Sequence, residues 1–458
     1  MKGRLSEAAA AVDARLAGAD GVFAGVSTDS RSIERGQLFF ALRGERFDGH
    51  TFAGAAAERG AAGAVVERPL DAALPQLVVR DALTALTALA RHWRDRSRAL
   101  VIGVGGSNGK TTTKELLAAI LAESGPTLAT RGNLNNHIGV PLTLLRLEPE
   151  HRYAVIEMGA NHPGEIAALA AAARPSIALV TNAGDEHLEG FGNLAGVARS
   201  EGEIYAALPA EGTAVINADD PFHELWRGMA RGSRIRTFGI EARAEVRATA
   251  IQGRIEQGGF VTAFTLALPG ASERVKLRLA GRHNVLNAAA AAAAAHATGA
   301  SPASIVAGLE HTRPVGGRLQ LKHGTRGAWV IDDSYNANPS SMRAGIDVLC
   351  ALPGEHWLVL GEMAELGDAT VSSHAGIGAY ARRAGVARLF ALGEAARHAV
   401  TSFGARGAWY EDAVRLAGEV ADGLDAGVTV LVKGSRVNRL ERVVERLVAP
   451  LPAAGNGN

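Results

Sequence analysis

The sequence predicts an α/β protein of three domains, with a central, mostly parallel sheet and a C-terminal, doubly wound domain. Two observations support this prediction. Apolar runs rich in β-branched residues alternate with helical stretches from about Ala99 onward, and parallel strands that are buried on both faces need such crossover helices. The chain of 458 residues is also too long for one hydrophobic core of ordinary size.

The domain boundaries follow from the places where this pattern changes. Residues 1–95 mix short strands with helix and are expected to form a small N-terminal α/β domain. Residues 96–313 hold the first strand and helix series, followed between Arg234 and Leu279 by short alternating segments that read as antiparallel strands appended to the central sheet. A proline and glycine cluster from Thr312 to Gly317 separates this part from a second α/β series in residues 314–458.

The strands and helices are expected in a regular order. Central strands are predicted at residues 99–104, 153–158, 176–181 and 213–217, with helices over 110–123 and 164–172, from about Asn193, and again from Asn284. Strands at 328–333, 357–363, 388–393 and 428–436 each precede a helical stretch. Because open α/β sheets bind ligands at the carboxyl ends of their strands, side chains at those ends are the first candidates for a functional site.

Composition limits the classes of function. Forty-eight basic and 47 acidic side chains give a net charge of +1, so no global field draws the chain to nucleic acid or to an anionic membrane surface. Cys350 is the only cysteine, and the N-terminal stretch carries charges throughout, so a reducing, cytoplasmic compartment is expected. No apolar run approaches the roughly eighteen residues of a membrane span.

The turn after the first central strand has the features of a phosphate site. Glycines let successive N–H groups point into one concavity, the helix N-terminus favours negative charge, Lys110 adds a cation and Thr111 a hydroxyl for Mg²⁺. The turn is one residue tighter than the common P-loop, whose first glycine would fall at Val104. A glycine turn with an exposed lysine is the alternative, but the order of strand, loop, Lys-Thr and helix favours a P-loop-like ATP site made by Gly105, Ser107, Asn108, Gly109, Lys110, Thr111 and Thr112.

Metal ligands are expected beside this loop. Glu157 ends the second central strand, and His187 follows the third. Glu157 could bind Mg²⁺ through oxygen and a neutral His187 could hold a second Mg²⁺, although imidazole is an unusual ligand for so hard an ion. Other carboxylates on the same side could be ligands or solvated charges: Asp185, Glu186, Glu201 and Glu203.

Beyond the loop, several segments resemble one family. GGSNGKTTTKE is similar to the short ATP loop of the Mur ligases, which are ATP-dependent amide synthetases of peptidoglycan precursors. The segments RGNLNNHIGVPLTLL, EMGANHPGEI, HLEGFGNLAGVA, GRHNVLNAAAA, DDSYNANPSSM, VLGEMAELG and LVKGSR follow in the order of that family. DDSYNANPSSM is typical of the branch that adds a D-alanyl-D-alanine dipeptide, and it argues against related ligases such as folylpolyglutamate synthases.

The resemblance implies an activity. It is the ligation of D-Ala-D-Ala to UDP-N-acetylmuramoyl-tripeptide through an acyl phosphate, with ATP and Mg²⁺ as cofactors and with ADP and phosphate released. The implied protein is a monomer without nucleic-acid partners, whose N-terminal domain binds the UDP end of the precursor and whose C-terminal, Rossmann-like domain contacts ATP and the dipeptide. The rival class is a nucleotide switch or motor ATPase that turns over ATP without an amino-acid acceptor.

Site residues carry over from the family one position at a time. Lys110 and Arg318 are implied at the phosphates, Glu157 and His187 as metal ligands at the reacting centre, and Thr111 as a ligand of Mg²⁺. Nucleotide contacts are implied for Asn284, Asn287, Asp333 and Tyr335. The dipeptide and the precursor are implied to contact Asn336, Asn338, Lys433, Arg436, Asn133, Asn135 and Asn136, and the UDP end Ser27, Asp29, Ser30 and Arg31 together with the loop Gly44 to His50.

Each of these groups has a structural alternative. Asn284 and Asn287 could cap a helix, and Asn336 and Asn338 before Pro339 could only shape a turn. Arg318 and Arg436 could be surface charges, and the segment from Ser27 to Arg31 could be a polar turn. These alternatives stay open at the level of the sequence.

One position departs from the family. In this superfamily a lysine commonly precedes the helix motif that here reads Glu201-Gly202-Glu203, and carbamoylation turns that lysine into a carboxylate that helps to organise the second Mg²⁺. The stretch from Ala198 to Glu201 has no lysine. The hypothesis is that Glu201 supplies an encoded carboxylate there, and the alternative is that Glu201 is a solvated helix charge.

Overall fold

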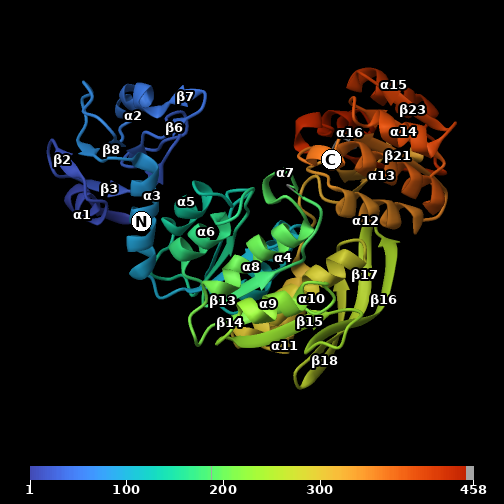
Figure 1. Ribbon diagram of the computed structural model, residues 1–458, viewed down its shortest axis with the longest axis horizontal. Coiled ribbons are helices and arrows are strands. Elements are labelled where there is room, and N and C mark those ends of the chain that lie inside the picture. The colour runs from blue at the N-terminus through green and yellow to red at the C-terminus, as the bar shows by residue number, and fades with distance from the viewer. Residues whose placement is uncertain (187, 450–458) are drawn as a thin grey trace, which may run out of the picture.

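The computed structural model describes residues 1–186 and 188–449. Three sheets of five, nine and six strands follow one another along the chain (Figure 1). The six-stranded C-terminal sheet lies far from the N-terminal one, with the nine-stranded sheet between them. No helix of the described ranges is long and apolar enough to cross a membrane.

The N-terminal sheet is small and mixed. Its strand order is β2-β9-β8-β5-β4, parallel except for the β2–β9 pair. The strands are β2 (Arg15–Ala17), β4 (Val26–Ser27), β5 (Leu38–Phe40), β8 (Gly63–Val66) and β9 (Gln76–Val78), with the two-stranded ribbons β1 (Lys2–Arg4) with β3 (Val22–Ala24) and β6 (Arg43–Gly44) with β7 (Phe47–Asp48). The helices are α1 (Leu5–Ala11), α2 (Ala53–Glu58) and α3 (Ala82–Asp95).

The central sheet has the order β11-β12-β10-β13-β14-β15-β16-β17-β18. Its strands are β10 (Leu100–Gly105), β11 (Thr127–Ala129), β12 (Tyr153–Glu157), β13 (Ile177–Val180), β14 (Thr213–Asn217), β15 (Arg234–Gly239), β16 (Val246–Glu256), β17 (Gly259–Leu268) and β18 (Ala271–Leu277). Strands β11 to β16 are parallel, and only the pairs β16–β17 and β17–β18 are antiparallel. The prediction that antiparallel strands begin at Arg234 is therefore wrong for β15, which continues the parallel series.

Helices cover both faces of this sheet, as its apolar strands require. They are α4 (Lys110–Ala122), α5 (Gly139–Leu144), α6 (Glu165–Ala173), α7 (Leu188–Phe191), α8 (Leu194–Ala206), α9 (His223–Met229), α10 (Arg282–Ala297) and α11 (Pro302–His311). The alanines from Ala288 to Ala295 are buried in α10, and their small side chains let this helix pack closely against α4 and the sheet. The opposite face is covered by α3, α5, α6 and α8.

The strand register brings the predicted site together. Val104 of β10 pairs with Glu157 of β12, and Gly105 pairs with Val180 of β13. The same edge of the sheet therefore holds the predicted phosphate loop (Gly105 to Thr112), Glu157 and the start of the segment after β13.

The C-terminal sheet has the order β19-β20-β24-β21-β22-β23, with only β19 antiparallel. Its strands are β19 (Gln320–His323), β20 (Trp329–Asp333), β21 (Glu355–Gly361), β22 (Arg388–Leu392), β23 (Gly407–Tyr410) and β24 (Val428–Lys433). The helices α12 (Pro339–Cys350), α13 (Thr370–Ala384), α14 (Arg397–Phe403), α15 (Ala413–Gly423) and α16 (Glu441–Leu447) form two apolar layers with it, as the prediction of a doubly wound sheet requires.

The long hairpin of β16 and β17 joins the central and C-terminal sheets. Figure 1 shows it extending toward α12. Phe260 of β17 belongs to the same apolar cluster as Leu319 and Ile331 of the C-terminal part, and Ile255 packs against that cluster. This apolar contact packs the hairpin against the C-terminal part of the chain.

A substitution at Gly308 tests how closely α11 packs against α4, the helix that follows the predicted phosphate loop (the phosphate-loop helix). A Cβ at Gly308 of α11 would collide with the backbone of Ile120 on α4. We expect Gly308→Ala to lower the free energy of unfolding by about 1–3 kcal/mol, because the helices must move apart. Urea denaturation measures this. Gly376→Ala in α13 is the control, since a Cβ there meets nothing and we expect it to stabilise by up to about 1 kcal/mol; equal effects at both positions would contradict the packing argument.

Candidate active site between the central and C-terminal domains

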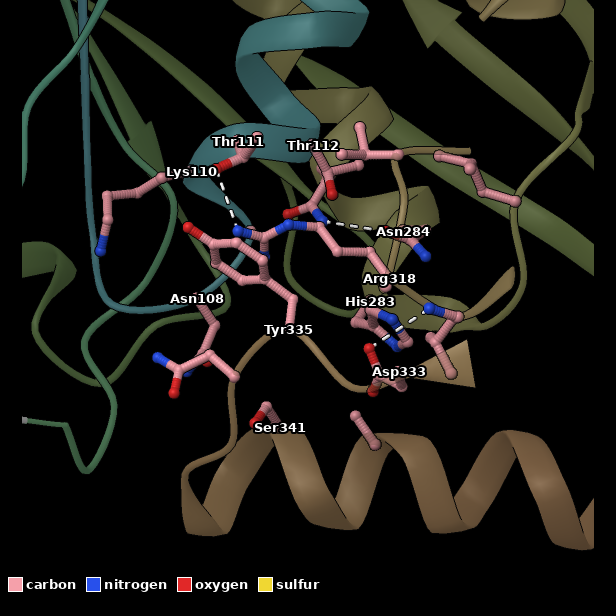
Figure 2. A pocket seen from close by; sticks show the side chains of 18 of the residues that line it. Asn108, Lys110, Thr111, Thr112, His283, Asn284, Arg318, Asp333, Tyr335 and Ser341 are labelled. Carbon is pink, nitrogen blue, oxygen red and sulfur yellow. Dashed lines mark hydrogen bonds between the residues drawn. The ribbon is translucent and has the colours of Figure 1, made fainter. Parts of the chain in front are cut away.

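A cavity of about 390 Å³ lies between the central and C-terminal parts of the chain. Its walls are the loop after β10, the carboxyl end of β12, the start of α10, the segment 312–319 and the carboxyl ends of β20 and β24. Figure 2 shows some of the side chains that line it, with α4 on one side and α12 on the other. The size is within the range of small-molecule sites.

The loop from β10 to α4 needs glycine at two positions. Gly106 and Gly109 have φ angles of 113° and 83°, where side chains are strained. A Cβ at Gly106 would collide with Thr181 and one at Gly109 with Asn287. The glycines thus allow the loop to lie against β13 and α10.

The first N–H groups of the loop are already bonded within the protein. The Gly106 N–H donates to Glu201 Oε2 at 2.5 Å, and the N–H groups of Ser107 and Asn108 donate to the carbonyl and side-chain oxygens of Asn182 at 2.9 and 3.1 Å. The Ser107 hydroxyl accepts from Gly184 N–H at 2.8 Å. Donors for an anion therefore come from the first turn of α4, whose N–H groups have no partner within the helix.

Lys110 lines the cavity but its ammonium points back at the loop. It donates to the carbonyls of Gly106 and Ser107 and lies 3.2 Å from Glu186 Oε1. Burial lowers the pKa of Lys110, but the carboxylates of Glu186, Glu201 and Glu157 outweigh burial and raise it above its ordinary value. Burial raises the pKa of Glu186 to about 7, although Lys110 opposes the rise. The lysine stays a cation that an incoming anion can attract away from Glu186.

Glu157 is buried at the edge of the cavity. Its Oε1 accepts from the Thr111 hydroxyl at 3.2 Å and from Asn135 Nδ2 at 2.9 Å, while the buried Oε2 has no hydrogen-bond donor. A carboxylate with an unused oxygen beside a hydroxyl is the kind of oxygen set that Mg²⁺ takes. The residues present therefore fit the metal that the sequence predicts.

Arg318 reaches from the interdomain segment to the loop. Its Nη2 donates to the Thr111 hydroxyl at 3.1 Å, and its guanidinium lies over the Tyr335 ring, 4.4 Å from the ring centre. Figure 2 shows the guanidinium between the loop and that ring. Stacking and hydrogen bonding fix the orientation of this planar cation, which is therefore a cleft residue and not a surface charge.

A buried ion pair lies at the C-terminal wall. Lys433 Nζ is 2.7 Å from Asp333 Oδ2 and donates to the Asn336 carbonyl at 2.9 Å. Burial raises the pKa of Asp333, and Lys433 opposes this. His283 also lines the cavity, and burial with the charge of Lys433 lowers its pKa to about 4, so its ring is neutral at neutral pH.

A ring of hydrogen bonds connects the loop to the start of α12. Asn108 Oδ1 accepts from Asn338 Nδ2 at 2.8 Å, Asn108 Nδ2 donates to Ser340 Oγ at 3.0 Å, and Ser340 Oγ donates to Asn338 Oδ1 at 3.1 Å. Asn338 also caps α12 by accepting from Ser341 N–H. The turn and cap alternative is thus confirmed for Asn338, which in addition contacts the other domain.

The asparagines of α10 do not cap its N-terminus, where Gly281 is the cap residue. Asn287 packs against Gly109 and donates to Asn284 Oδ1 at 3.1 Å, and Asn284 donates to the Ala280 carbonyl at 2.8 Å. Both are buried side chains of the cavity wall. The capping alternative is therefore wrong for this pair.

Several predicted residues lie outside the cavity lining. Arg436 is exposed and pairs with Glu441, and Asn136 accepts from the N–H groups at the start of α5. The segment from Ser27 to Arg31 belongs to the N-terminal sheet region, where Arg31 lowers the pKa of Asp29 to about 2 through their ion pair. The residues of the prediction outside the lining are Ser27, Asp29, Ser30, Arg31, Gly105, Asn136, Glu201 and Arg436. Their roles stay predictions.

The second metal site has two predicted ligands. His187 lies outside the described residues. Glu201 is buried in α8, and its carboxylate accepts a hydrogen bond from the Gly106 N–H behind the loop. It is therefore not a solvated helix charge, while its role as a metal ligand stays a hypothesis.

Sequence reasoning gave no role to several residues that the structure places in or behind the cavity wall. Among them are Lys114, Glu115, His283 and Ser340. A charged residue at Lys114, one turn after Lys110 on an otherwise apolar helix face, is the one signal that could have been noticed. The hydrogen bond of Ser340 depends on the docking of the third domain, which no local pattern encodes.

Three family models match successive parts of the chain. The Mur ligase middle domain matches residues 104–295, the Mur ligase glutamate ligase domain residues 317–436, and the catalytic-domain model of the Mur ligase family residues 22–94. The chain is 44% identical to the UDP-N-acetylmuramoyl-tripeptide–D-alanyl-D-alanine ligase of Escherichia coli K12, covering 97% of this chain and 98% of the relative. It is 36% identical to the ligase of the same name from Bacillus subtilis, with 93% of each chain covered.

Solved structures agree with these matches. A crystal structure of MurF from Acinetobacter baumannii is 37% identical and superposes with a TM-score of 0.90, covering 96% of this chain and 97% of that one. The MurF ligase of Thermotoga maritima in complex with ADP is 28% identical with a TM-score of 0.81, covering 92% and 96%.

The burial of Glu186 predicts a pH dependence of stability, because burial raises the pKa of its carboxyl although Lys110 opposes the rise. The pKa of the Glu186 carboxyl rises from about 4.5 in the unfolded chain to about 7 in the folded protein. Its contribution to the free energy of unfolding is therefore fully present below about pH 4.5 and is lost as the pH rises through about 7. Without nucleotide, the free energy of unfolding of the wild type should fall between pH 5 and pH 8. In Glu186→Gln we expect this fall to be smaller by about 2 kcal/mol. Urea denaturation at both pH values measures it, with exposed Glu211→Gln as control; parallel pH profiles of the wild type and Glu186→Gln would contradict it.

The hydrogen-bonded ring predicts a change in domain separation. We expect Ser340→Ala to shift the equilibrium toward separated domains by about fivefold, the effect of one hydrogen bond of ~1 kcal/mol. Electron paramagnetic resonance distances between spin labels at Glu224→Cys and Arg383→Cys, in a Cys350→Ser background, report the populations. Ser372→Ala on the exposed face of α13 is the control, and a distance distribution for Ser340→Ala identical to that of the control would refute a role of the ring.

Proposed function

This chain belongs to the Mur ligase family, and on that basis we propose that it is an ATP-dependent amide ligase. It joins D-alanyl-D-alanine to UDP-N-acetylmuramoyl-tripeptide and releases ADP and phosphate. Relatives named UDP-N-acetylmuramoyl-tripeptide–D-alanyl-D-alanine ligase match nearly the whole chain. The cytoplasmic location and monomeric state expected from the sequence stay predictions.

The chemistry explains why a nucleotide is needed. A carboxylate does not react with an amine at neutral pH because oxide would have to leave, so the carboxyl must first become an acyl phosphate. The γ-phosphoryl group moves to the terminal carboxylate of the tripeptide, and the free amine of D-Ala-D-Ala then attacks the acyl carbon. The tetrahedral oxyanion collapses to the amide and inorganic phosphate.

The cationic residues of the cavity carry the first step. Lys110, released from Glu186, and Arg318, held by Thr111 and Tyr335, offset the charge on the phosphoryl oxygens. Glu157 and Thr111 would hold Mg²⁺, which when bound polarises the phosphoryl oxygens. Asn284 and Asn287 bind the adenine side, and Asp333 and Tyr335 lie toward the ribose.

The C-terminal domain brings the second substrate. Asn336 and Asn338 at the end of β20 and the start of α12 contact the dipeptide, together with Lys433. Asn133 and Asn135 hold the acceptor end of the precursor beside Glu157, and Ser27 to Arg31 bind its distant UDP end. Closure of the domains excludes water from an intermediate that hydrolyses readily.

One observation supports the proposal most strongly. The hydrogen bond of Arg318 to Thr111 places a cation from outside the central domain on the first residues of the phosphate-loop helix. A nucleotide bound there contacts both domains at once. Domain closure is thereby tied to the position of the phosphates, as a ligation of two separately bound substrates requires.

Omission of each substrate tests the activity. With ATP, Mg²⁺, UDP-N-acetylmuramoyl-tripeptide and D-Ala-D-Ala present, we expect phosphate release that falls by at least about a hundredfold when either peptide is left out, because bound nucleotide has no productive acceptor. A coupled phosphate assay on the purified protein measures this, with mass spectrometry of the pentapeptide product. Phosphate release that needs neither peptide would instead indicate a nucleotide switch or motor.

A further inference from the structure

Lys114 is a fully buried lysine directly behind Glu157. It lies one turn after Lys110 on α4, and its ammonium donates to the Thr130 carbonyl at 2.7 Å. The same ammonium lies 3.6 Å from Glu157 Oε2 and 3.0 Å from Glu115 Oε1. Lysine is almost never fully buried unless it is paired. The question is therefore what a buried lysine does behind Glu157.

The two members of this pair face different surroundings. Glu157 and Glu115 line the cavity, whereas Lys114 does not. The Glu115 side chain is 41% exposed, so that water screens its charge, while Glu157 is buried. Glu157 Oε1 is hydrogen-bonded to Thr111 and Asn135, which line the cavity. The buried Oε2, which has no hydrogen-bond donor, lies 3.6 Å from the Lys114 ammonium, so Lys114 balances the negative charge of Glu157 from behind.

A balanced carboxylate attracts a dication weakly. Lys114 repels a divalent metal at Glu157 across a partly buried site, where charges interact more strongly than in water. The phosphates of a nucleotide add several negative charges on the cavity side and outweigh this repulsion. The metal would then bind well only together with the nucleotide.

We infer that Lys114 makes divalent-metal binding at Glu157 conditional on nucleotide. The inference rests on the proposed function, in which Glu157 is a metal ligand, and adds the residue that regulates that site. Lys114 is a positioning residue, because it acts through Glu157 and contacts no substrate.

Mn²⁺ binding to the full-length protein tests this without any turnover. Free Mn²⁺ is measured by electron paramagnetic resonance during titration, with and without ADP. We expect the wild type to bind Mn²⁺ alone at least about tenfold more weakly than with ADP, and Lys114→Gln to bind Mn²⁺ alone at least about tenfold more tightly than the wild type does. Glutamine keeps an N–H donor and removes the positive charge; Lys114→Met is a second uncharged variant in case one of them fails to fold.

Two measurements locate the bound ion and separate this inference from the function on which it rests. Adding ADP to a one-to-one complex of Mn²⁺ with Lys114→Gln must produce ³¹P hyperfine coupling, whereas an ion in the place of the lost ammonium gives none. Lys276→Gln, on an exposed lysine of the far edge strand β18, must behave as the wild type. If the double variant Lys114→Gln, Glu157→Gln still binds Mn²⁺ tightly, the metal role of Glu157 fails.

The inference is overturned in three cases. These are equal Mn²⁺ affinity of the wild type with and without ADP, an uncharged Lys114 variant that binds Mn²⁺ alone no more tightly than the wild type, and tight binding without phosphorus coupling. The proposed ligase activity would stand in each of these cases, provided that Glu157→Gln weakens Mn²⁺ binding in the presence of ADP.

Discussion

The turn from Gly105 to Lys110 is held on three sides, and the site depends on this arrangement. Glu201 fixes the Gly106 N–H from behind, Asn182 holds the next two N–H groups, and the side chain of Asn108 is bonded to the C-terminal domain. Because these donors are committed, an anion must use the first turn of α4 and the cations around it. The same contacts tie the loop to the domain that would deliver the second substrate, so nucleotide binding and domain docking share one set of atoms.

The charged side chains in and behind the cavity wall are balanced in pairs. Lys110 pairs with Glu186, Lys114 with Glu157, and Lys433 with Asp333, and each pair is mostly or wholly buried. A buried ion pair contributes little to stability, but it holds each charge in a fixed orientation and compensates that charge in the absence of a ligand. The cavity is thus prepared for a triphosphate and a metal while its own charges are compensated.

The sequence predicted the fold well wherever local patterns decide the structure. The apolar runs with their intervening helices predicted the parallel sheets, and the strand ends predicted Glu157 beside the loop, as the pairing of Val104 with Glu157 shows. It failed for β15, whose alternating residues resemble those of the antiparallel strands although its hydrogen bonds continue the parallel series. The site was predicted less completely, since the contacts of Ser340 and Lys114 depend on how distant segments dock. The predicted domain boundaries stay untested.

The central claim is that the cavity activates a peptide acid by transferring a phosphoryl group to it. Its most direct test follows oxygen from a tripeptide precursor labelled with ¹⁸O in its terminal carboxylate. If the acid is phosphorylated and the amine displaces phosphate, one ¹⁸O per product formed must appear in the released inorganic phosphate, measured by mass spectrometry. Unlabelled phosphate in the presence of amide product would contradict the account.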